Sequence, residues 1–301
     1  MLQKFNPKNE GIFIHVGGQL LPRNEAKVSV FDSSVQGGDA VWEGLRVYKG
    51  KIFHLDQHLN RLRESAHSLA FGAIPPEEVI KKAIFETLAA NGMRDETHIR
   101  LTLTRGEKIT SGMDPRLNQQ GPCLIVLAEW KPAVYDNKAG IRLVTANIRR
   151  NSPQFLDSKI HHNNLLNNIL AKIEANVAGA DDALMLDKDG FVAETNATNL
   201  FMVKNGHLLT PFPTACLPGI TRKTVLEIAR ELNIPAAEHN LSVTDFYNAD
   251  EVFTTGTMGE LTPVVEIDQR TIGRGNNWPV LDQLRVGFDT RVAKEGTPLP
   301  F

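Results

Sequence analysis

The segment from Asn151 to Gly206 constrains the fold of this chain more than any other. It places Lys159 just ahead of a stretch whose apolar residues recur at helical spacing, namely Leu165, Leu166, Ile169, Leu170, Ile173 and Val177. This spacing predicts an amphipathic helix with one buried face. A β-hairpin is predicted next, with Ala183–Leu186 and Phe191–Glu194 joined through Asp189-Gly190.

Glu194 ends the second predicted strand and opens a small polar cluster that consists of Thr195, Asn196, Ala197, Thr198 and Asn199. One lysine, one carboxylate and a patch of hydroxyl and amide groups therefore lie within a compact unit. A carbonyl cofactor held as a Schiff base requires such a set, because an amine forms the imine and an acid keeps the ring nitrogen protonated. Taken alone, a lysine beside a helix and a glutamate after a strand are more often solvated surface residues.

Two further segments favour a cofactor site over solvated surface residues. The first is Leu217–Arg222 (LPGITR), which leads into a predicted helix and places Ile220 and Thr221 in its first turn. Unpaired backbone amides and the positive end of the helix dipole favour a phosphate at such a turn. The second is Phe253–Pro263 (FTTGTMGELTP), in which Gly256-Thr257 offers another amide and hydroxyl after a short strand. Each is a weak signal by itself, since helices often start after Pro-Gly and threonine-rich turns are common.

Together and in this order, the motifs resemble the class IV (fold type IV) pyridoxal-phosphate aminotransferases, and most of all the branched-chain amino acid aminotransferases. The resemblance runs over nearly the whole chain, from Val41–Arg46 (VWEGLR) to Thr262-Pro263-Val264. The individual motifs are short, so their joint order and spacing make the resemblance specific. D-amino acid aminotransferases and aminodeoxychorismate lyase are relatives on the same scaffold.

The resemblance implies pyridoxal 5'-phosphate as cofactor, together with the residues that bind it. Lys159 matches the lysine that bonds to the cofactor and carries protons in catalysis. Glu194 matches the carboxylate that pairs with the pyridine nitrogen, and Arg61 matches the arginine that clamps the phosphate. The other implied cofactor-binding positions are the phosphate-cup residues Leu217, Gly219, Ile220, Thr221, Gly256 and Thr257, and the loop residues Ala197, Thr198 and Asn199.

The resemblance also implies a substrate site. Arg46 and Arg100 match the branched-chain pattern, and Trp42 stands where that branch usually has Phe or Tyr. The amides of Thr257 and Met258 are expected to receive the α-carboxylate. The alternative for either arginine is a surface or structural ion pair.

Three departures affect the expected pocket. Asn164, His98 and Gly37 stand where branched-chain enzymes carry tyrosine or another aromatic residue. The pocket is therefore expected to lose phenol groups and to gain space near Gly37. The run Thr104-Arg105-Gly106 continues without the Arg-x-His that D-amino acid aminotransferases use for the carboxylate, which argues against that branch. A noncanonical amine or amino acid donor remains open.

The resemblance implies a two-domain fold type IV architecture, mixed α+β and α/β, similar to that of D-amino acid aminotransferase. The chain has 301 residues, 42% of them hydrophobic, which is enough for good cores. We expect a smaller α+β domain over 1–130, a polar, turn-rich linker over 131–140 and a larger cofactor-binding domain over 141–301. Arg61 comes from the first half and the other cofactor residues from the second, so a cleft between the domains is the expected site. Within the first half, Gly17-Gly18 and Lys49-Gly50 are the expected turns of two hairpins, and Lys27–Phe31 alternates as a strand. Asp56 is the expected cap of one helix, and Asn91-Gly92 is expected to stop the next. In the second half, a strand is expected at Arg142–Ala146.

Charge and residue usage argue against several other classes of protein. A formal net charge of −2 gives no electrostatic case for nucleic acid or an anionic membrane. The apolar run Cys123–Ala128 is far too short to span a bilayer, and no apolar leader stands at the start. Cys123 and Cys216 form no metal motif, and neighbouring histidines such as His161-His162 rarely chelate together, so no metal site is expected. The chain is predicted to be cytoplasmic.

The sequence thus predicts a transaminase that moves an amino group between an apolar, branched-chain-like amino acid and a 2-oxo acid such as 2-oxoglutarate. The alternatives are a D-amino acid or (R)-amine transaminase, the aminodeoxychorismate lyase reaction, or a non-catalytic binding protein with the same fold. Retention of Lys159 with Glu194 argues against a pure binding role, which needs no imine. The long polar loop Thr104–Gln120 is predicted to close the active site of a partner chain, which implies a homodimer or a larger oligomer.

Overall fold

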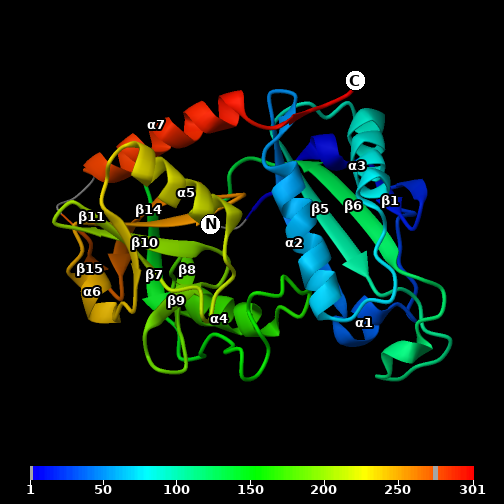
Figure 1. Cartoon of the computed structure of the whole chain (residues 1–301), viewed down its shortest axis with the longest axis horizontal. Coiled ribbons are helices and arrows are strands. Elements are labelled where there is room, and N and C mark those ends of the chain that lie inside the picture. Colours follow the sequence, from blue (N-terminus) through cyan, green and yellow to red (C-terminus); the bar gives the residue numbers. More distant parts are fainter. Residues whose placement is uncertain (1–2, 274–276) are drawn as a thin grey trace. The chain divides into compact units, whose positions relative to one another are not determined.

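The computed structural model describes residues 3–273 and 277–301, shown in Figure 1. The chain divides into two compact units. The first unit contains residues 3–132 of the described chain together with Ile160–Asn164 and Val292–Phe301. The second unit contains Ala133–Lys159 and Leu165–Arg291. Lys159 is therefore the last residue of a second-unit segment, and the five residues that follow it in sequence belong to the first unit.

Among its described residues the first unit contains a seven-stranded sheet in the order β16-β4-β3-β5-β6-β1-β2. The strands are β1 (Phe13–Val16), β2 (Gln19–Pro22), β3 (Ala40–Tyr48), β4 (Lys51–Ile52), β5 (Thr97–Thr104), β6 (Cys123–Trp130) and β16 (Thr297–Pro298). Both long pairings, β3 with β5 and β5 with β6, are antiparallel. These central strands present one face to the helices, so alternate residues on them are apolar.

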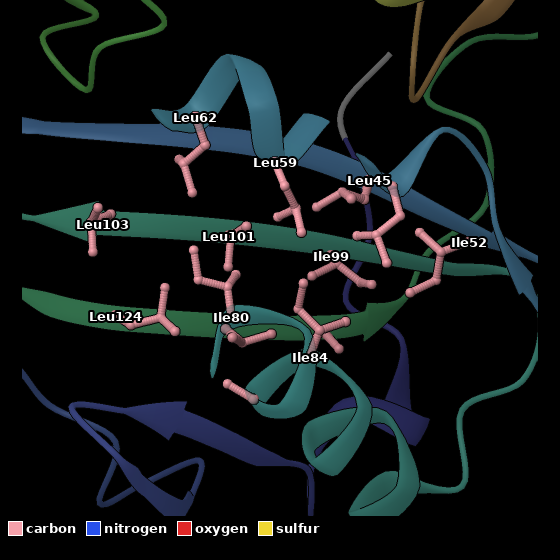
Figure 2. Close-up of a cluster of buried hydrophobic side chains, with 14 of the residues drawn as sticks. Leu45, Ile52, Leu59, Leu62, Ile80, Ile84, Ile99, Leu101, Leu103 and Leu124 are labelled. Carbon is pink, nitrogen blue, oxygen red and sulfur yellow. The ribbon is translucent and has the colours of Figure 1, made fainter. Parts of the chain in front are cut away.

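Two helices, α2 (Leu55–Ser68) and α3 (Glu77–Asn91), pack on that face. Figure 2 shows their apolar side chains meeting those of the sheet in one core. The labelled residues are Leu59 and Leu62 from α2, Ile80 and Ile84 from α3, and Leu45, Ile52, Ile99, Leu101, Leu103 and Leu124 from the strands or next to them. On β5 the core residues alternate with His98 and Arg100, which therefore lie on the opposite face of the sheet.

The local predictions in this unit differ in outcome. The hairpin turns at Gly17-Gly18 and Lys49-Gly50 form between β1 and β2 and between β3 and β4, where all four residues have positive φ. Helix α3 ends at Gly92, whose φ of 64° suits a left-handed cap. Asp56 lies inside the first turn of α2 and does not cap it, because His54 holds the cap position in a left-handed conformation.

The strand predicted at Lys27–Phe31 is absent from the described structure. The hydroxyl of Ser29 accepts the backbone N–H of Phe31 at 3.1 Å. Asp32 then caps the short helix α1 (Ser33–Gly37) by accepting the N–H of Ser34 at 2.8 Å. Local side-chain hydrogen bonds of this kind compete with strand pairing, and here they produce a turn.

Among its described residues the second unit contains a nine-stranded mixed sheet in the order β12-β11-β10-β13-β14-β7-β8-β9, with β15 paired to β14. The strands are β7 (Ile141–Thr145), β8 (Asp182–Leu186), β9 (Val192–Thr195), β10 (Asn199–Lys204), β11 (His207–Pro211), β12 (Ala236–His239), β13 (Glu251–Gly256), β14 (Glu260–Ile267) and β15 (Arg270–Thr271). The predicted hairpin is confirmed as β8 and β9, which pair antiparallel.

The helices of the second unit are α4 (Leu166–Val177), α5 (Ile220–Glu231), α6 (Val243–Tyr247) and α7 (Pro279–Lys294). Helix α4 forms where it is predicted, but the prediction that its large apolar residues are buried is wrong. Its buried residues are Ala171 and Ala175, whereas Leu166, Ile169, Leu170, Ile173 and Val177 are exposed. The small alanines let α4 approach β8 closely, and the large residues form an exposed strip that we call the α4 apolar face. No helix among the described residues is long and apolar enough to cross a membrane.

Candidate functional site

A buried carboxylate organises the polar residues on the helix-facing side of the first unit. Glu43 of β3 is fully buried and lies opposite α2. Arg61 of α2 donates to both of its oxygens, from Nε to Oε1 and from Nη2 to Oε2, each at 2.7 Å. His58 Nδ1 lies 2.7 Å from Oε2, and His161 Nδ1 lies 3.1 Å from Oε1. The sequence-predicted Arg61 is therefore held at two points by a residue that the sequence did not mark as functional.

The charges in this cluster follow from its burial. Burial disfavours the charged form of Glu43, but His161 and Arg61 outweigh it and hold the pKa of that carboxyl well below its usual range. Burial lowers the pKa of His161 to about 4, although Glu43 opposes this shift. At neutral pH, Glu43 is therefore an anion, His161 is neutral, and Arg61 supplies the compensating charge.

The residues next to Lys159 are fixed on the first unit. The backbone N–H of His161 donates to Ser65 Oγ at 3.0 Å, and that of Asn163 donates to the Ala40 carbonyl at 2.8 Å. The His161 ring also lies 4.1 Å from the Trp42 ring, centroid to centroid. Lys159 itself is exposed, and its backbone N–H donates to Asp157 Oδ1 at 3.0 Å. An exposed amine at the end of an anchored segment is available to react.

The opposite face of the first-unit sheet carries the predicted substrate residues. Strand register pairs Gly44 with Arg100 and Arg46 with His98. The Arg100 guanidinium lies 3.8 Å from the Trp42 ring centroid, and its Nη2 donates to Asn163 Oδ1 at 2.7 Å. Burial lowers the pKa of Arg100 to about 10. Among the described residues no carboxylate pairs with Arg100, so this partly buried cation has no counter-charge from them.

His98 lies among cations on the same face. Burial, together with Lys131, Arg100 and Arg46, lowers the pKa of His98 to about 3. The imidazole is therefore neutral near pH 7, and the positive charge of this face comes from the arginines. Gly44 leaves room for the ring, since a Cβ there would lie 3.4 Å from His98 Nε2.

Glu194, the predicted partner of the ring nitrogen, is buried in the second unit beside a residue that the sequence reading missed. Arg150 Nε donates to Glu194 Oε1 at 2.5 Å, and Asn199 Nδ2 donates to Oε2 at 3.3 Å. Arg150 is held in turn by Asn167 Oδ1, 3.0 Å from its Nη1. Burial raises the pKa of Glu194, although the charge of Arg150 lowers it. The signal in the sequence was the pair Arg149-Arg150 shortly after a predicted strand.

The predicted phosphate-binding turn meets the polar cluster that follows Glu194. Asn199 Nδ2 also donates to the Leu217 carbonyl at 2.9 Å. Gly219 caps α5, and a Cβ there would lie only 2.1 Å from Asn199 Oδ1, so this approach requires glycine. Gly256 lies against Thr198, whose Cγ2 would be 3.1 Å from an added Cβ. The structure thus brings two predicted glycine turns to the same cluster.

Ile220 and Thr221 occupy the first turn of α5, as predicted from the LPGITR motif. The first-turn amides of a helix have no intrahelical acceptor and carry the positive end of the dipole. Thr221 is buried and adds a hydroxyl. Ala197, by contrast, is exposed, and its N–H donates to the Thr195 hydroxyl at 3.1 Å, so we assign it a role in the shape of the loop.

A second set of residues missed at the sequence level holds the turn that contains Thr257 and Met258. Val134 N–H donates to the Met258 carbonyl at 3.0 Å. A Cβ on Gly259 would lie 2.8 Å from the Tyr135 ring, and the Tyr135 hydroxyl donates to Asp182. Residues just after the unit boundary at Pro132 therefore fix the backbone of this turn. No local pattern in the sequence marks that contact.

Two of the departures from the branched-chain pattern lie at exposed positions. Gly37 is exposed, and an added Cβ would meet no atom within 4 Å. Asn164 is exposed and lies against Gly38. Because these residues are glycine and asparagine, neither position supplies the aromatic side chain that the branched-chain pattern has there.

Comparison with known proteins places these features in a family. The sequence model of the family described as amino-transferase class IV matches residues 40–267. The chain is 61% identical over 294 residues to branched-chain-amino-acid aminotransferase-like protein 2 of Arabidopsis thaliana, covering 98% of this chain and 53% of that protein. It thus spans about half the length of that relative. It is 40% identical to a putative branched-chain-amino-acid aminotransferase of Methanocaldococcus jannaschii, covering 91% and 94% of the two chains.

The solved structures agree. A branched-chain aminotransferase from the thermophilic archaeon Thermoproteus uzoniensis, crystallised with norvaline, is 31% identical and has a TM-score of 0.85, covering 95% of this chain and 96% of that one. The architecture is accordingly that of the fold type IV pyridoxal-phosphate enzymes, as the sequence predicted. The chain belongs to the class IV aminotransferase family.

Proposed function

We propose that this chain is a pyridoxal-phosphate-dependent transaminase that moves an amino group between an apolar, branched-chain-like amino acid and a 2-oxo acid such as 2-oxoglutarate. The observation that carries the proposal is the buried Glu194, oriented by Arg150 and Asn199, in a chain that also presents an exposed Lys159. A pure binding role needs no imine and so gives no reason to keep this lysine together with this carboxylate. Relatives that bear the name branched-chain aminotransferase support the substrate class.

The donor set of the chain fits the cofactor. A phosphate dianion fits the first-turn amides of α5, the hydroxyls of Thr221 and Thr257, and the guanidinium of Arg61. A protonated ring nitrogen fits the acceptor Glu194, and the loop of Ala197, Thr198 and Asn199 is proposed to lie under the ring. Bound there, pyridoxal phosphate would supply an aldehyde for covalent attachment and a ring that takes up electrons from the substrate α-carbon.

Each residue then has a defined task. Lys159 Nζ removes the proton from the substrate α-carbon as general base and returns it as general acid in the second half of the shift. Glu194 holds a proton at the ring nitrogen, which an anion can do only while Arg150 keeps it ionised against the cost of burial. Arg61, Thr221 and the α5 amides hold the phosphate, so binding free energy goes into orientation.

The substrate residues are assigned on charge. Arg100 has no carboxylate partner among the described residues and fits the second carboxylate of glutamate or 2-oxoglutarate. Arg46 and Trp42 lie on the same sheet face and are proposed to complete the side-chain pocket. The turn at Thr257 and Met258 is proposed to receive the α-carboxylate through its amides.

We also infer that the protein is cytoplasmic and forms a homodimer or a larger oligomer. The α4 apolar face leaves five large apolar side chains exposed, and Met113, in the loop Thr104–Gln120, is 98% exposed. Exposed apolar groups of this number favour a protein partner. A second copy that covers them, with its own loop closing the substrate pocket, is the arrangement that the family resemblance implies. No nucleic acid or membrane is proposed as a partner.

A panel of amino donors tests the proposal. The reconstituted protein is incubated with 2-oxoglutarate and with L-valine, L-leucine, L-isoleucine, D-alanine or a pair of chiral amines, and glutamate formation is measured. We expect the L-branched donors to react fastest. A preference for D-alanine or the (R)-amine would replace the substrate assignment, and no glutamate with any donor would contradict a transaminase.

A further inference from the structure

We propose that Glu43 is a positioning residue that sets the orientation of the Arg61 guanidinium for a phosphate group. The proposal rests on the proposed function, because it takes Arg61 as the phosphate clamp. Glu43 itself faces the helix side of the sheet and does not belong to the predicted set of cofactor residues.

The geometry shows why Arg61 needs this support. Its side chain comes from α2 and could adopt many rotamers, and an arginine loses that rotamer freedom when it is fixed. The two-point contact from Nε and Nη2 to the Glu43 carboxylate fixes both the direction and the plane of the guanidinium. A phosphate that binds Arg61 therefore meets a guanidinium whose orientation is set before the ligand arrives.

The negative charge of Glu43 also helps to keep the Arg61 guanidinium in its buried position. A carboxylate behind the arginine cancels much of the cost of burying the guanidinium, so Arg61 stays in place when the phosphate is absent. Glu43 is fully buried and ionised, with its pKa held well below the usual range. A neutral residue of the same shape could accept from Arg61 at one oxygen only.

Glu43 further ties Arg61 to the chain that carries Lys159. The same carboxylate contacts His161, two residues after Lys159, and His58, one turn before Arg61 on α2. The His161 backbone is bonded to Ser65, also on α2. A single buried side chain thus connects the phosphate clamp with the segment next to the reactive amine.

The experiment compares Glu43→Gln, Arg61→Ala and the double variant as apo-proteins. Dissociation constants are measured for pyridoxal 5'-phosphate, for inorganic phosphate and for pyridoxal, which lacks the phosphate. Asp39→Asn is the matched control, because Asp39 makes a similar two-point pair with Arg105 in the same unit, at 2.6 and 3.0 Å. Removing a residue that orients a ligand-binding group costs about 10- to 100-fold in affinity at metal sites, and we expect a similar loss here.

We expect Glu43→Gln to weaken pyridoxal phosphate and inorganic phosphate by about 10-fold or more and to weaken pyridoxal much less, because the His161 backbone stays bonded to Ser65. In the Arg61→Ala background it should add nothing, because the effect passes through Arg61. Asp39→Asn should leave all three constants unchanged. Equal weakening of pyridoxal, or additive losses in the double variant, would overturn the proposal.

A replacement variant covers the case in which Glu43→Gln does not fold, and the Arg61→Ala result tests the phosphate clamp separately. If Glu43→Gln does not fold, Arg61→Lys replaces it, because lysine keeps the charge but not the two-point contact. Lysine at this position should bind phosphate almost as weakly as alanine, and affinity equal to that of the natural protein would overturn the role of Glu43. An Arg61→Ala protein with unchanged cofactor affinity would instead overturn the proposed phosphate clamp itself.

Discussion

Arg150 Nε donates to Glu194 Oε1 at 2.5 Å, and both side chains are buried. The two residues are 44 positions apart in the chain, on either side of Lys159. Burial raises the pKa of Glu194, and the charge of Arg150 opposes that rise. The proposed task of Glu194 therefore depends on Arg150.

Replacing Arg150 should damage both stability and cofactor binding. Arg150→Met leaves a buried carboxylate without its cation, which typically costs about 3–5 kcal/mol of the free energy of unfolding. The pKa of Glu194 should rise further, so any residual activity should shift to higher pH. The control is Arg149→Met, because Arg149 Nη1 donates to the carbonyls of Ala146 and Asn147 and, within the described part of the chain, pairs with no carboxylate. Urea unfolding and pH–rate profiles of the two variants check this. An Arg149 variant that is damaged as severely would remove the special role of Arg150.

A substitution at Tyr135 should offset the damage that a substitution at Gly259 causes to substrate binding. Gly259→Ala places a methyl group 2.8 Å from the Tyr135 ring and should displace the turn of Thr257 and Met258. We expect the KM for the amino acid to rise by about 10-fold, equivalent to about 1.4 kcal/mol, with a smaller change in kcat. Adding Tyr135→Ala removes the clash and should restore much of the KM. Steady-state kinetics of the single and double variants measure this, and strictly additive losses would contradict the proposed contact.

The half-buried His98 should make the apo-protein less stable in mild acid. The unfolded chain binds a proton on this imidazole near pH 6.5, whereas the folded protein does so only near pH 3. Between these values the unfolded state holds more protons, so the free energy of unfolding falls as the pH drops, by about 1.4 kcal/mol per pH unit from this group. His98→Asn should abolish that contribution. Urea titrations at pH 6.5 and pH 5 should give a difference between the two proteins that changes by about 2 kcal/mol. A constant difference would show that His98 is protonated in the folded protein.

Much of the first unit and the Glu194 hairpin could be predicted because their signals are local. Gly17-Gly18, Lys49-Gly50 and Asp189-Gly190 each fix a turn through residues adjacent in sequence. Helical periodicity placed α4 correctly but could not show what covers its face, so the burial of Ile169 and Ile173 was predicted wrongly.

The residues that support the site could not be predicted from the sequence, for a different reason. Arg150 pairs across 44 positions and Glu43 pairs with His161 across 118, and neither separation leaves a periodic trace. Lys159, Glu194 and the LPGITR turn could be predicted as site residues because they carry recognisable chemistry in a fixed order. The side chains that orient them are ordinary residues made important by the fold.

The α4 apolar face should control assembly. Ile173→Asp puts a charge in the centre of that face and should weaken the dimer by at least about 10-fold in dissociation constant. Val286→Asp on α7 is the matched control, since Val286 is also exposed but lies on another helix. Sedimentation over a dilution series, with specific activity measured in parallel, checks both variants. A dimer unaffected by Ile173→Asp would place the interface elsewhere, and a fully active monomer would contradict the assembly.

The most direct test of the central claim is the identity of the lysine that bonds to the cofactor. The natural protein, Lys159→Ala and the control Lys188→Ala are loaded with pyridoxal phosphate, reduced with borohydride, digested and mapped by mass spectrometry. We expect the reduced cofactor on Lys159 in the natural and Lys188→Ala proteins. The folded Lys159→Ala protein should carry none and should lose transamination by at least about 1,000-fold. Cofactor mass on a different lysine, or substantial turnover without Lys159, would contradict the account.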